Sequence, residues 1–190
     1  MAYTASNVTT AKQGATSTIS IAPVGTALPA NATTALNEAF KALGHISEDG
    51  VTFSISRDSQ DIKNMDGTTV YTPQTSVAGT IQFGLLEGLS VDAKGAMYGV
   101  DNVSGALPSG ITATFSGAEP DEVAIVFESV LRGGVLHRVV VPRAKLTDTG
   151  DIVYKGDEGL VYDLTYTAMA NDSNELWKEY TAKPSNGSNV

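Results

Sequence analysis

The chain has 190 residues, enough for one domain, of which 42% are hydrophobic and 17% charged. Charged residues are scarce, and 21 Thr, 16 Ser and 19 Gly take their place, a mixture that argues against a helical bundle and favours strands and turns. The net charge of −9 argues against a nucleic-acid grip based on phosphate neutralisation, and the lack of cysteine excludes a disulfide framework and a thiolate metal site.

Both ends of the chain are rich in small polar residues. Residues 1–17 are mainly Thr, Ala, Ser and Asn, and Ser185–Val190 has a similar composition. Such segments bury too little apolar surface to fold alone. We therefore expect an N-terminal arm over residues 1–17, a β-domain over residues 18–181 and a C-terminal tail over residues 182–190. The arms are expected to be disordered alone or ordered by a neighbour.

Alternation of apolar and polar residues predicts several strands with one apolar face, at residues 51–56, 77–86, 111–115 and 159–169. Their apolar positions are, in order, Val51, Phe53 and Ile55; Val77, Ile81, Phe83 and Leu85; Ile111, Ala113 and Phe115; and Leu160, Tyr162, Leu164 and Tyr166. The opposite face of each strand carries mainly Thr, Ser, Gln or Asp. Each is therefore expected to have one face in the core.

Two further segments predict a β-hairpin. Residues 122–131 and 135–146 flank Arg132-Gly133-Gly134, a typical hairpin turn. Both segments carry apolar residues on both faces, so we expect them to be buried on two sides. Residues 175–181 are expected to form a last strand or a terminal arm.

Helix signals are few. Residues 34–43 have a Thr cap and an Ala, Leu and Phe stripe that ends at Gly44. Residues 86–97 form a second candidate, with Ser90 as a cap and glycines that weaken it. The predicted fold is mainly β: two packed antiparallel sheets, as a sandwich or barrel, with one or two short helices.

One connection is unusually long. Residues 58–75 separate two well-defined strands, whereas most loops in compact domains are far shorter and long ones are usually functional. Ile62, Met65, Val70 and Tyr71 are spaced along this long loop. These apolar residues are typical of a contact with another surface.

No pattern in the chain indicates catalysis or a cofactor. His45 follows a predicted helix end, and His137 lies within a predicted strand without a motif that pairs it with Ser and Asp. The acidic turn around Asp148 and Asp151 is too short for a calcium loop, and no phosphate-binding glycine motif is present. We therefore expect no enzyme, no metal and no cofactor. No apolar stretch is long enough to suggest a membrane partner.

The run Leu43–Thr52 (LGHISEDGVT) resembles a stretch of siphophage major tail proteins, the tail tube subunits, particularly those of phages of Gram-positive and actinobacterial hosts. Arg57-Asp58 and Gly156-Asp157-Glu158, which precedes a late strand, are also similar to that family. The resemblance covers residues 39–170, and His45 departs from the usual aromatic or small apolar residue. It implies a phage tail tube fold with a flanking helix and a long inter-strand loop.

The resemblance also implies a role. Hexameric rings of such subunits stack into a non-contractile tube around a tape measure protein, between a tail terminator and a distal tail protein. The tube belongs to the virion tail, is assembled in the host cytoplasm, and lets genomic DNA pass without specific binding. The long loop contacts the adjacent ring, which here gives Asp61, Ile62, Lys63, Met65, Val70 and Tyr71 that role.

The strands that flank the long loop have one small-polar face, and a closed ring of them would present this face to the bore. Small hydroxyls and a few acids give DNA nothing to grip, whereas Lys or Arg would hold phosphates. The expected lumen-facing residues are Thr52, Ser54, Ser56, Asp58, Thr80 and Gln82.

Two other classes of function remain open from the sequence. One is a different β-structured assembly protein, such as a pilin-like or head-decoration subunit, which would have no bore. The other is a carbohydrate-binding β-sandwich, which needs an exposed aromatic platform and would place a sugar near Trp177.

Overall fold

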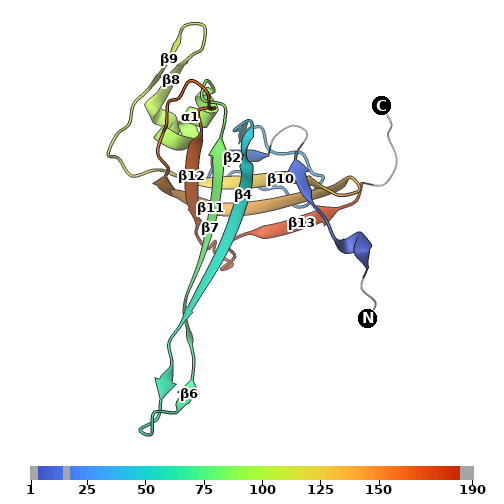
Figure 1. The fold of residues 1–190 in the computed structure, drawn as a ribbon, viewed down its shortest axis with the longest axis vertical. Coiled ribbons are helices and arrows are strands. Elements are labelled where there is room, and N and C mark those ends of the chain that lie inside the picture. The colour runs from blue at the N-terminus through green and yellow to red at the C-terminus, as the bar shows by residue number, and fades with distance from the viewer. Residues whose placement is uncertain (1–3, 15–17, 185–190) are drawn as a thin grey trace.

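The computed structural model describes residues 4–14 and 18–184. Within these residues, one nine-stranded antiparallel sheet dominates the fold (Figure 1). The main order is β3-β2-β10-β11-β12-β7-β4, while β1 pairs with β10 and β13 pairs with β11. The strands are β1 (Ala11–Gln13), β2 (Ile19–Pro23), β3 (Lys41–Ala42), β4 (Ile46–Ser59), β7 (Gln74–Leu85), β10 (Glu122–Leu131), β11 (Val135–Thr149), β12 (Tyr162–Ala168) and β13 (Lys178–Ala182).

Strand β11 joins the two layers that the sequence predicts. Its first half pairs with β10 and β13, and its last residues, from Ala144 to Thr149, pair with β12. Pro142, which has no N–H to donate, lies between the two halves. The chain is mainly β as predicted, but the two layers are one continuous sheet. Gln13 links β1, which pairs with β10, to the edge strand β4: its Nε2 donates a hydrogen bond to the carbonyl of Ile46 at 3.0 Å.

The core lies between the folded halves of this sheet. Phe83 stacks on Tyr166 with 5.9 Å between ring centroids, and both are almost completely buried. Burial raises the pKa of the Tyr166 hydroxyl, which donates to the carbonyl of Ala96 at 2.9 Å. The predicted double burial of the β10–β11 hairpin is confirmed, since Ile125 belongs to this core and Val126 to a second apolar cluster on the other side.

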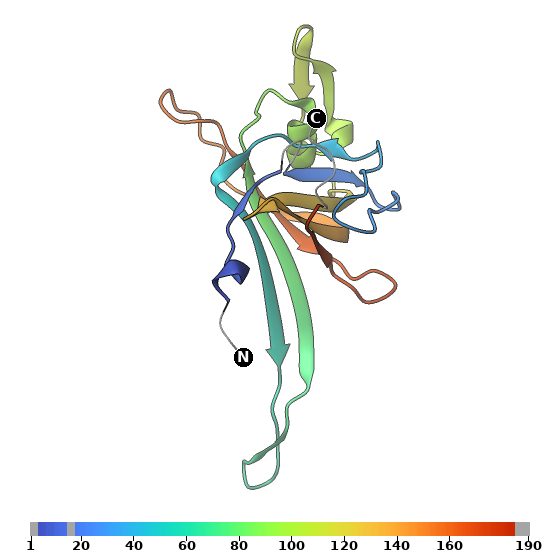
Figure 2. The same ribbon diagram turned by 90° about the vertical axis from the view of Figure 1, so that its right-hand side faces the viewer.

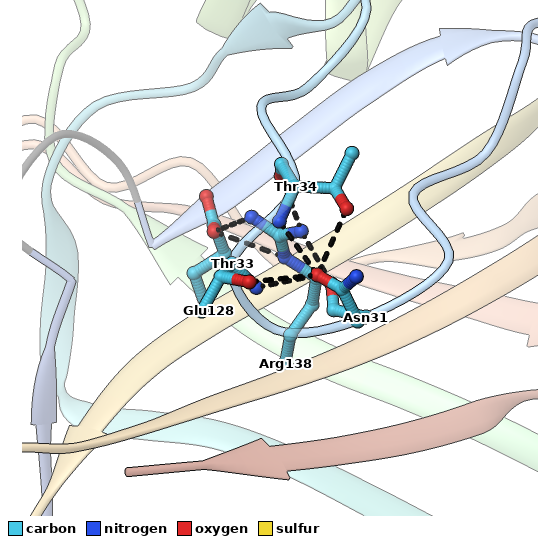
Figure 3. A network of polar contacts seen from close by, with 5 residues as sticks. All are labelled: Asn31, Thr33, Thr34, Glu128 and Arg138. Carbon is cyan, nitrogen blue, oxygen red and sulfur yellow. Dashed lines mark hydrogen bonds and ion pairs between the residues drawn. The ribbon is translucent and has the colours of Figure 1, made fainter. Parts of the chain in front are cut away.

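The predicted helix at residues 34–43 is wrong. This segment runs through bends and a turn to β3, because other groups take its backbone partners. Asn31 Oδ1 accepts from the N–H groups of Thr33 and Thr34, and Arg138 donates to the carbonyls of Asn31 and Thr34 at 2.7 Å each (Figure 3). Phe40 and Leu43 then enter two different apolar clusters.

Arg138 holds this segment against the back of the sheet. Its side chain is 6% exposed, and its Nε also donates to Glu128 Oε1 at 3.1 Å. Arg138→Met is expected to lower the free energy of unfolding by about 3–5 kcal/mol, because it leaves a carboxylate and two carbonyls without their partner. Arg143→Met, which breaks the more exposed pair with Glu122, is the control and should cost much less. Urea unfolding followed by circular dichroism measures both, and equal losses would contradict the assignment.

The helix predicted at residues 86–97 exists, but it starts later. Helix α1 spans Val91–Tyr98, and Ser90 Oγ accepts from the N–H of Ala93 as the predicted cap. The short 3-10 helices are η1 (Ala5–Asn7) and η2 (Val100–Asn102). The strand predicted at residues 111–115 exists as β9 (Gly110–Ala113), which pairs with β8 (Val103–Ala106) in a hairpin outside the large sheet. The inward position predicted for Phe115 is wrong, because the strand ends at Ala113 and Phe115 is 82% exposed beyond it.

The ends of the chain fall partly outside the described residues, namely residues 1–3 and 15–17 of the expected N-terminal arm and residues 185–190 of the expected tail. In the described part of the arm, β1 joins the sheet of its own chain along β10. The strand expected at residues 175–181 exists as β13. The limits 1–17, 18–181 and 182–190 stay predictions.

Candidate assembly surface

The long connection between β4 and β7 is an ordered arm and not an irregular loop. Figures 1 and 2 show it projecting far from the body, and its distal part contains β5 (Ile62–Lys63) paired with β6 (Thr69–Tyr71). At the tip, Asn64 Oδ1 accepts from the N–H groups of Asp66 and Thr68. We call residues 58–75 the arm. Its own hydrogen bonds shape it, because nearly all of its residues are exposed.

The arm presents apolar side chains to solvent. Met65 is completely exposed at the tip, and Ile62, Val70 and Tyr71 are exposed by 50–63%. The structure brings together the six residues expected to touch an adjacent ring, because Asp61 and Lys63 lie on the same arm. A projection that exposes several large apolar side chains to solvent is typical of a protein–protein contact.

The six residues expected to face a bore lie on one face of β4 and β7. Thr52 is opposite Gln82, Ser54 is opposite Thr80, and Asp58 is opposite Ser76 with its carboxylate 2.7 Å from the Ser76 hydroxyl. Cross-strand partners project to the same side of a sheet, so these residues form one surface. Ser56 belongs to it through its pairing with Ala78. We call this surface the polar face. Whether it faces a bore stays a prediction.

The polar face continues onto β12. Thr165 pairs with Gln82, and Thr167 pairs with Thr80. Asp58 of β4 and Asp163 of β12 add carboxylates to this face. Arg57 points to the opposite side, since it pairs with Val77. The surface therefore combines small hydroxyl and amide groups with carboxylates.

Basic side chains appear where this surface reaches β11, but each is paired. Lys145 binds Glu119 and Arg143 binds Glu122. The hydrogen bond from Arg143 lowers the pKa of Glu122, so the carboxylate keeps its charge and the pair stays neutral. These cations are already compensated within their own subunit.

The opposite face of β4 and β7 carries a groove that the sequence analysis missed. Phe53 and Trp177 meet edge to face with ring centroids 5.5 Å apart, and a Cβ on Gly79 would overlap the Trp177 ring. Just beyond, a groove of about 570 Å³ opens between the base of the arm and the chain that leads to β13. Gly79 in the middle of a regular strand was the signal, because such a glycine often marks a close approach.

Comparison with known protein families decides what this architecture is. The family model described as phage tail tube protein matches residues 1–187. The chain belongs to the phage tail tube protein family. No curated protein matches the chain in sequence. The finding supports a structural role in a phage tail, and favours it over the pilin-like, head-decoration and carbohydrate-binding alternatives.

The run Leu43–Thr52 that resembles tail tube subunits is a structural corner in this family member. Gly44 has a φ of 84°, and the Glu87 carboxylate occupies the space that a Cβ would need. Glu87 Oε1 accepts from the N–H of His45 at 3.0 Å, while Leu43 and Ile46 are buried on either side. The motif thus directs the chain into β4, which carries the polar face and the arm.

His137 has partners that the sequence analysis did not find. Its Nδ1 lies 3.0 Å from Ser129 Oγ and its Nε2 lies 2.8 Å from Glu179 Oε1, which is a Ser-His-Glu arrangement. Ser129 is only 4% exposed in the centre of the sheet. A nucleophile must reach its substrate, so this set ties β10, β11 and β13 together instead of forming a catalytic site.

The acidic turns do not converge. Among the residues that the structure describes, no group of three or more His, Cys, Asp or Glu side chains is arranged to hold a metal ion. Lys155 and Glu158, in the turn that resembles the family, pair with each other at 2.7 Å. In the described part of the chain, no helix is long and apolar enough to cross a membrane.

Proposed function

We propose that the chain is the repeating subunit of a non-contractile tail tube, of a siphophage that infects a Gram-positive, actinobacterial host. Six subunits form each ring, and rings stack head to tail around a tape measure protein between a tail terminator and a distal tail protein. The tube is assembled in the host cytoplasm and becomes part of the virion. The role is structural and not enzymatic, and the polar face lines the bore through which genomic DNA passes.

The observation that carries this proposal is the open sheet that presents the polar face. Within the described residues, β4 pairs with β7 on one side only. At the other border, β11 extends beyond its last pair with β10, Lys145 with Glu122, so Leu146–Thr149 have a partner in β12 alone. Exposed edges of this kind favour pairing with another chain.

The two edges suit a ring. If β4 of one subunit pairs with the end of β11 of the next, the contact joins two different surfaces, and a closed rotation produces a ring with no open edge. The polar face of each subunit then continues into that of its neighbour. The arm supports stacking along the axis, because it extends beyond the body and carries exposed apolar residues (Figure 1).

The composition of the polar face supports passage of DNA. Asp58 and Asp163 repel phosphate, and the net charge of −9 per chain is repeated in every subunit of a ring. Phosphate binding needs Lys or Arg groups free to replace counterions.

The experiment is negative-stain electron microscopy of the purified chain at high concentration, with light scattering at low concentration. We expect hollow tubes of uniform width with a regular axial repeat, whose class averages show six subunits around the axis. Because tail tube growth depends on an initiator, the same measurement is made with the distal tail complex added. Monomers under both conditions would contradict the proposal, and tubes with another symmetry would overturn the hexamer alone.

A further inference from the structure

The β8–β9 hairpin is a second projection, at the end of the molecule opposite the arm (Figure 1). Its turn is closed by the N–H of Ser109, which donates to the carbonyl of Ala106 at 3.0 Å. Leu107 in this turn is 58% exposed. Residues 102–118 contain no Asp, Glu, Lys, Arg or His, although 17% of the chain is charged. A solvated projection normally carries charge, so this hairpin has the composition of a contact surface.

A matching surface lies at the base of the arm, below the body. The groove of about 570 Å³ is lined by Ile55 and Val77 from the two strands and by Leu176 and Trp177 from the chain leading to β13. Ile55 and Val77 are 58% and 39% exposed. They lie on the same side of β4 and β7 as Phe53 and Ile81, which pack into the core closer to the body. The charged residue in the lining is Arg57, whose Nη1 donates to Gln74 Oε1 at 2.9 Å. We call this the arm-base groove.

Charge separates this groove from the other large cavity. That cavity, of about 580 Å³ beside the end of α1, is lined by four carboxylates, those of Asp101, Glu119, Asp121 and Asp148. The arm carries Asp58, Asp61 and Asp66 against one lysine, so seating the arm there would bring like charges together. The hairpin carries no charged residue and the arm-base groove carries one, so these two surfaces can meet without repulsion between like charges.

We propose that the turn of the β8–β9 hairpin, residues 106–109, docks into the arm-base groove of a second copy of this chain in the next ring. The proposal rests on the proposed function, since it needs stacked rings. The hairpin and the groove lie on opposite sides of the body, so the contact joins two different surfaces and repeats without closing, which lengthens the tube. Leu107 is the anchor, set among Ile55, Val77 and Trp177.

The groove also explains how one ring holds the next at two places. The arm projects from one end of the subunit and the β8–β9 hairpin projects from the other (Figures 1 and 2). A hairpin seated at the base of a neighbour's arm would cover the apolar side of that arm where it leaves the body. The docked hairpin would then support the base of the arm and help to fix the direction in which the arm projects.

The lack of native cysteine allows a direct test. Subunits with Leu107→Cys and subunits with Val77→Cys are mixed, assembled into tubes and oxidised. We expect a disulfide-linked dimer on a non-reducing gel. Leu107→Cys mixed with Val153→Cys is the control, because Val153 is similarly exposed, at 51%, in a different loop. Tubes with no dimer, or with equal dimer in both mixtures, overturn the docking and leave the tube intact. A wild-type chain that forms no tubes overturns the tube and the docking together.

The sole tryptophan gives a measurement on the unmodified chain. Trp177 lines the groove, so its quenching by iodide should fall at least about twofold when subunits assemble. Leu107→Lys, which brings a cation against Arg57, should prevent tube growth, whereas Val153→Lys should not. Wild-type tubes in which Trp177 is quenched as strongly as in free subunits would overturn the docking, as would normal tubes from Leu107→Lys.

Discussion

A subunit in which Asn-Gly replaces Asp61–Thr72 is expected to fold normally and to form no tubes. The replaced residues are all exposed, and the remaining strands still pair up to Ser59 and Gln74. Asn-Gly suits the short turn that joins two such strands. The melting temperature should stay within about 3 °C of wild type, because the deletion removes less than about 1 kcal/mol of stability. Tube growth should stop, since the apolar side chains of the arm are lost.

A matched pair of variants separates the effect of the apolar side chains of the arm from the effect of its length. The dipeptide Val-Tyr occurs at positions 70–71 in the arm and again at positions 153–154 in a body loop, with each residue at least half exposed. Val70→Ser/Tyr71→Ser should raise the concentration needed for assembly about tenfold or more, because a contact weakened by about 1.4 kcal/mol has this effect. Val153→Ser/Tyr154→Ser should leave it unchanged. Sedimentation of tubes measures both, and equal effects would count against the arm as the ring-to-ring contact.

The strands were predictable because one face of each is apolar and the other is polar. Val51, Phe53, Thr52 and Ser54 alternate over a period of two, and this pattern alone places the first pair inward and the second outward. The double burial of β10 and β11 was equally visible, since apolar residues occupy consecutive positions there. The polar face followed from the same alternation, although its role came from the resemblance to tail tube subunits.

The helix at residues 34–43 failed for a reason that no local pattern contains. The carbonyl of Thr34, at the start of the segment, accepts from Arg138, about a hundred residues away in the chain, and local propensity yields to such a buried contact. Phe115 failed in the opposite way: the alternation continued, but the hydrogen-bonded strand ended at Ala113. The arm-base groove could not be predicted from a local pattern, because it joins Ile55 and Val77 to Leu176 and Trp177, about a hundred or more positions further along the chain.

Two glycines differ in how they could be recognised, because one lies in a sequence motif and the other does not. Gly44 belongs to the run that resembles the family, and its left-handed φ of 84° makes room for the Glu87 carboxylate at the entry to β4. Gly79 belongs to no motif, and it lets Trp177 lie against β7. Gly44 thus shapes the entry to the strand that carries the polar face, and Gly79 shapes the packing beside the arm-base groove. A sequence pattern identifies the first, and only the packing identifies the second.

Lysine on the polar face is expected to leave tubes intact and to block DNA delivery. Thr52 and Gln82 are exposed, and neither side chain contributes to the core, so Thr52→Lys and Gln82→Lys subunits should fold and polymerise. They are tested singly, because two lysines directly opposite each other would repel across the strands. In a hexameric ring each substitution adds a circle of six cations, and the circle is repeated at every ring along the bore.

These cations would bind phosphate as the DNA moves. Infectivity of a phage complemented with Thr52→Lys subunits should fall about tenfold or more, because about 1.4 kcal/mol of added retention slows transit tenfold. Purified Thr52→Lys tubes should also retain DNA in a salt-dependent manner. Thr52→Glu is the matched control: it changes the charge by the same amount in the other direction and should leave delivery near the wild-type level. If both variants deliver DNA equally well, the polar face does not line the bore, and the face of the sheet that meets the genome must be sought elsewhere in the subunit.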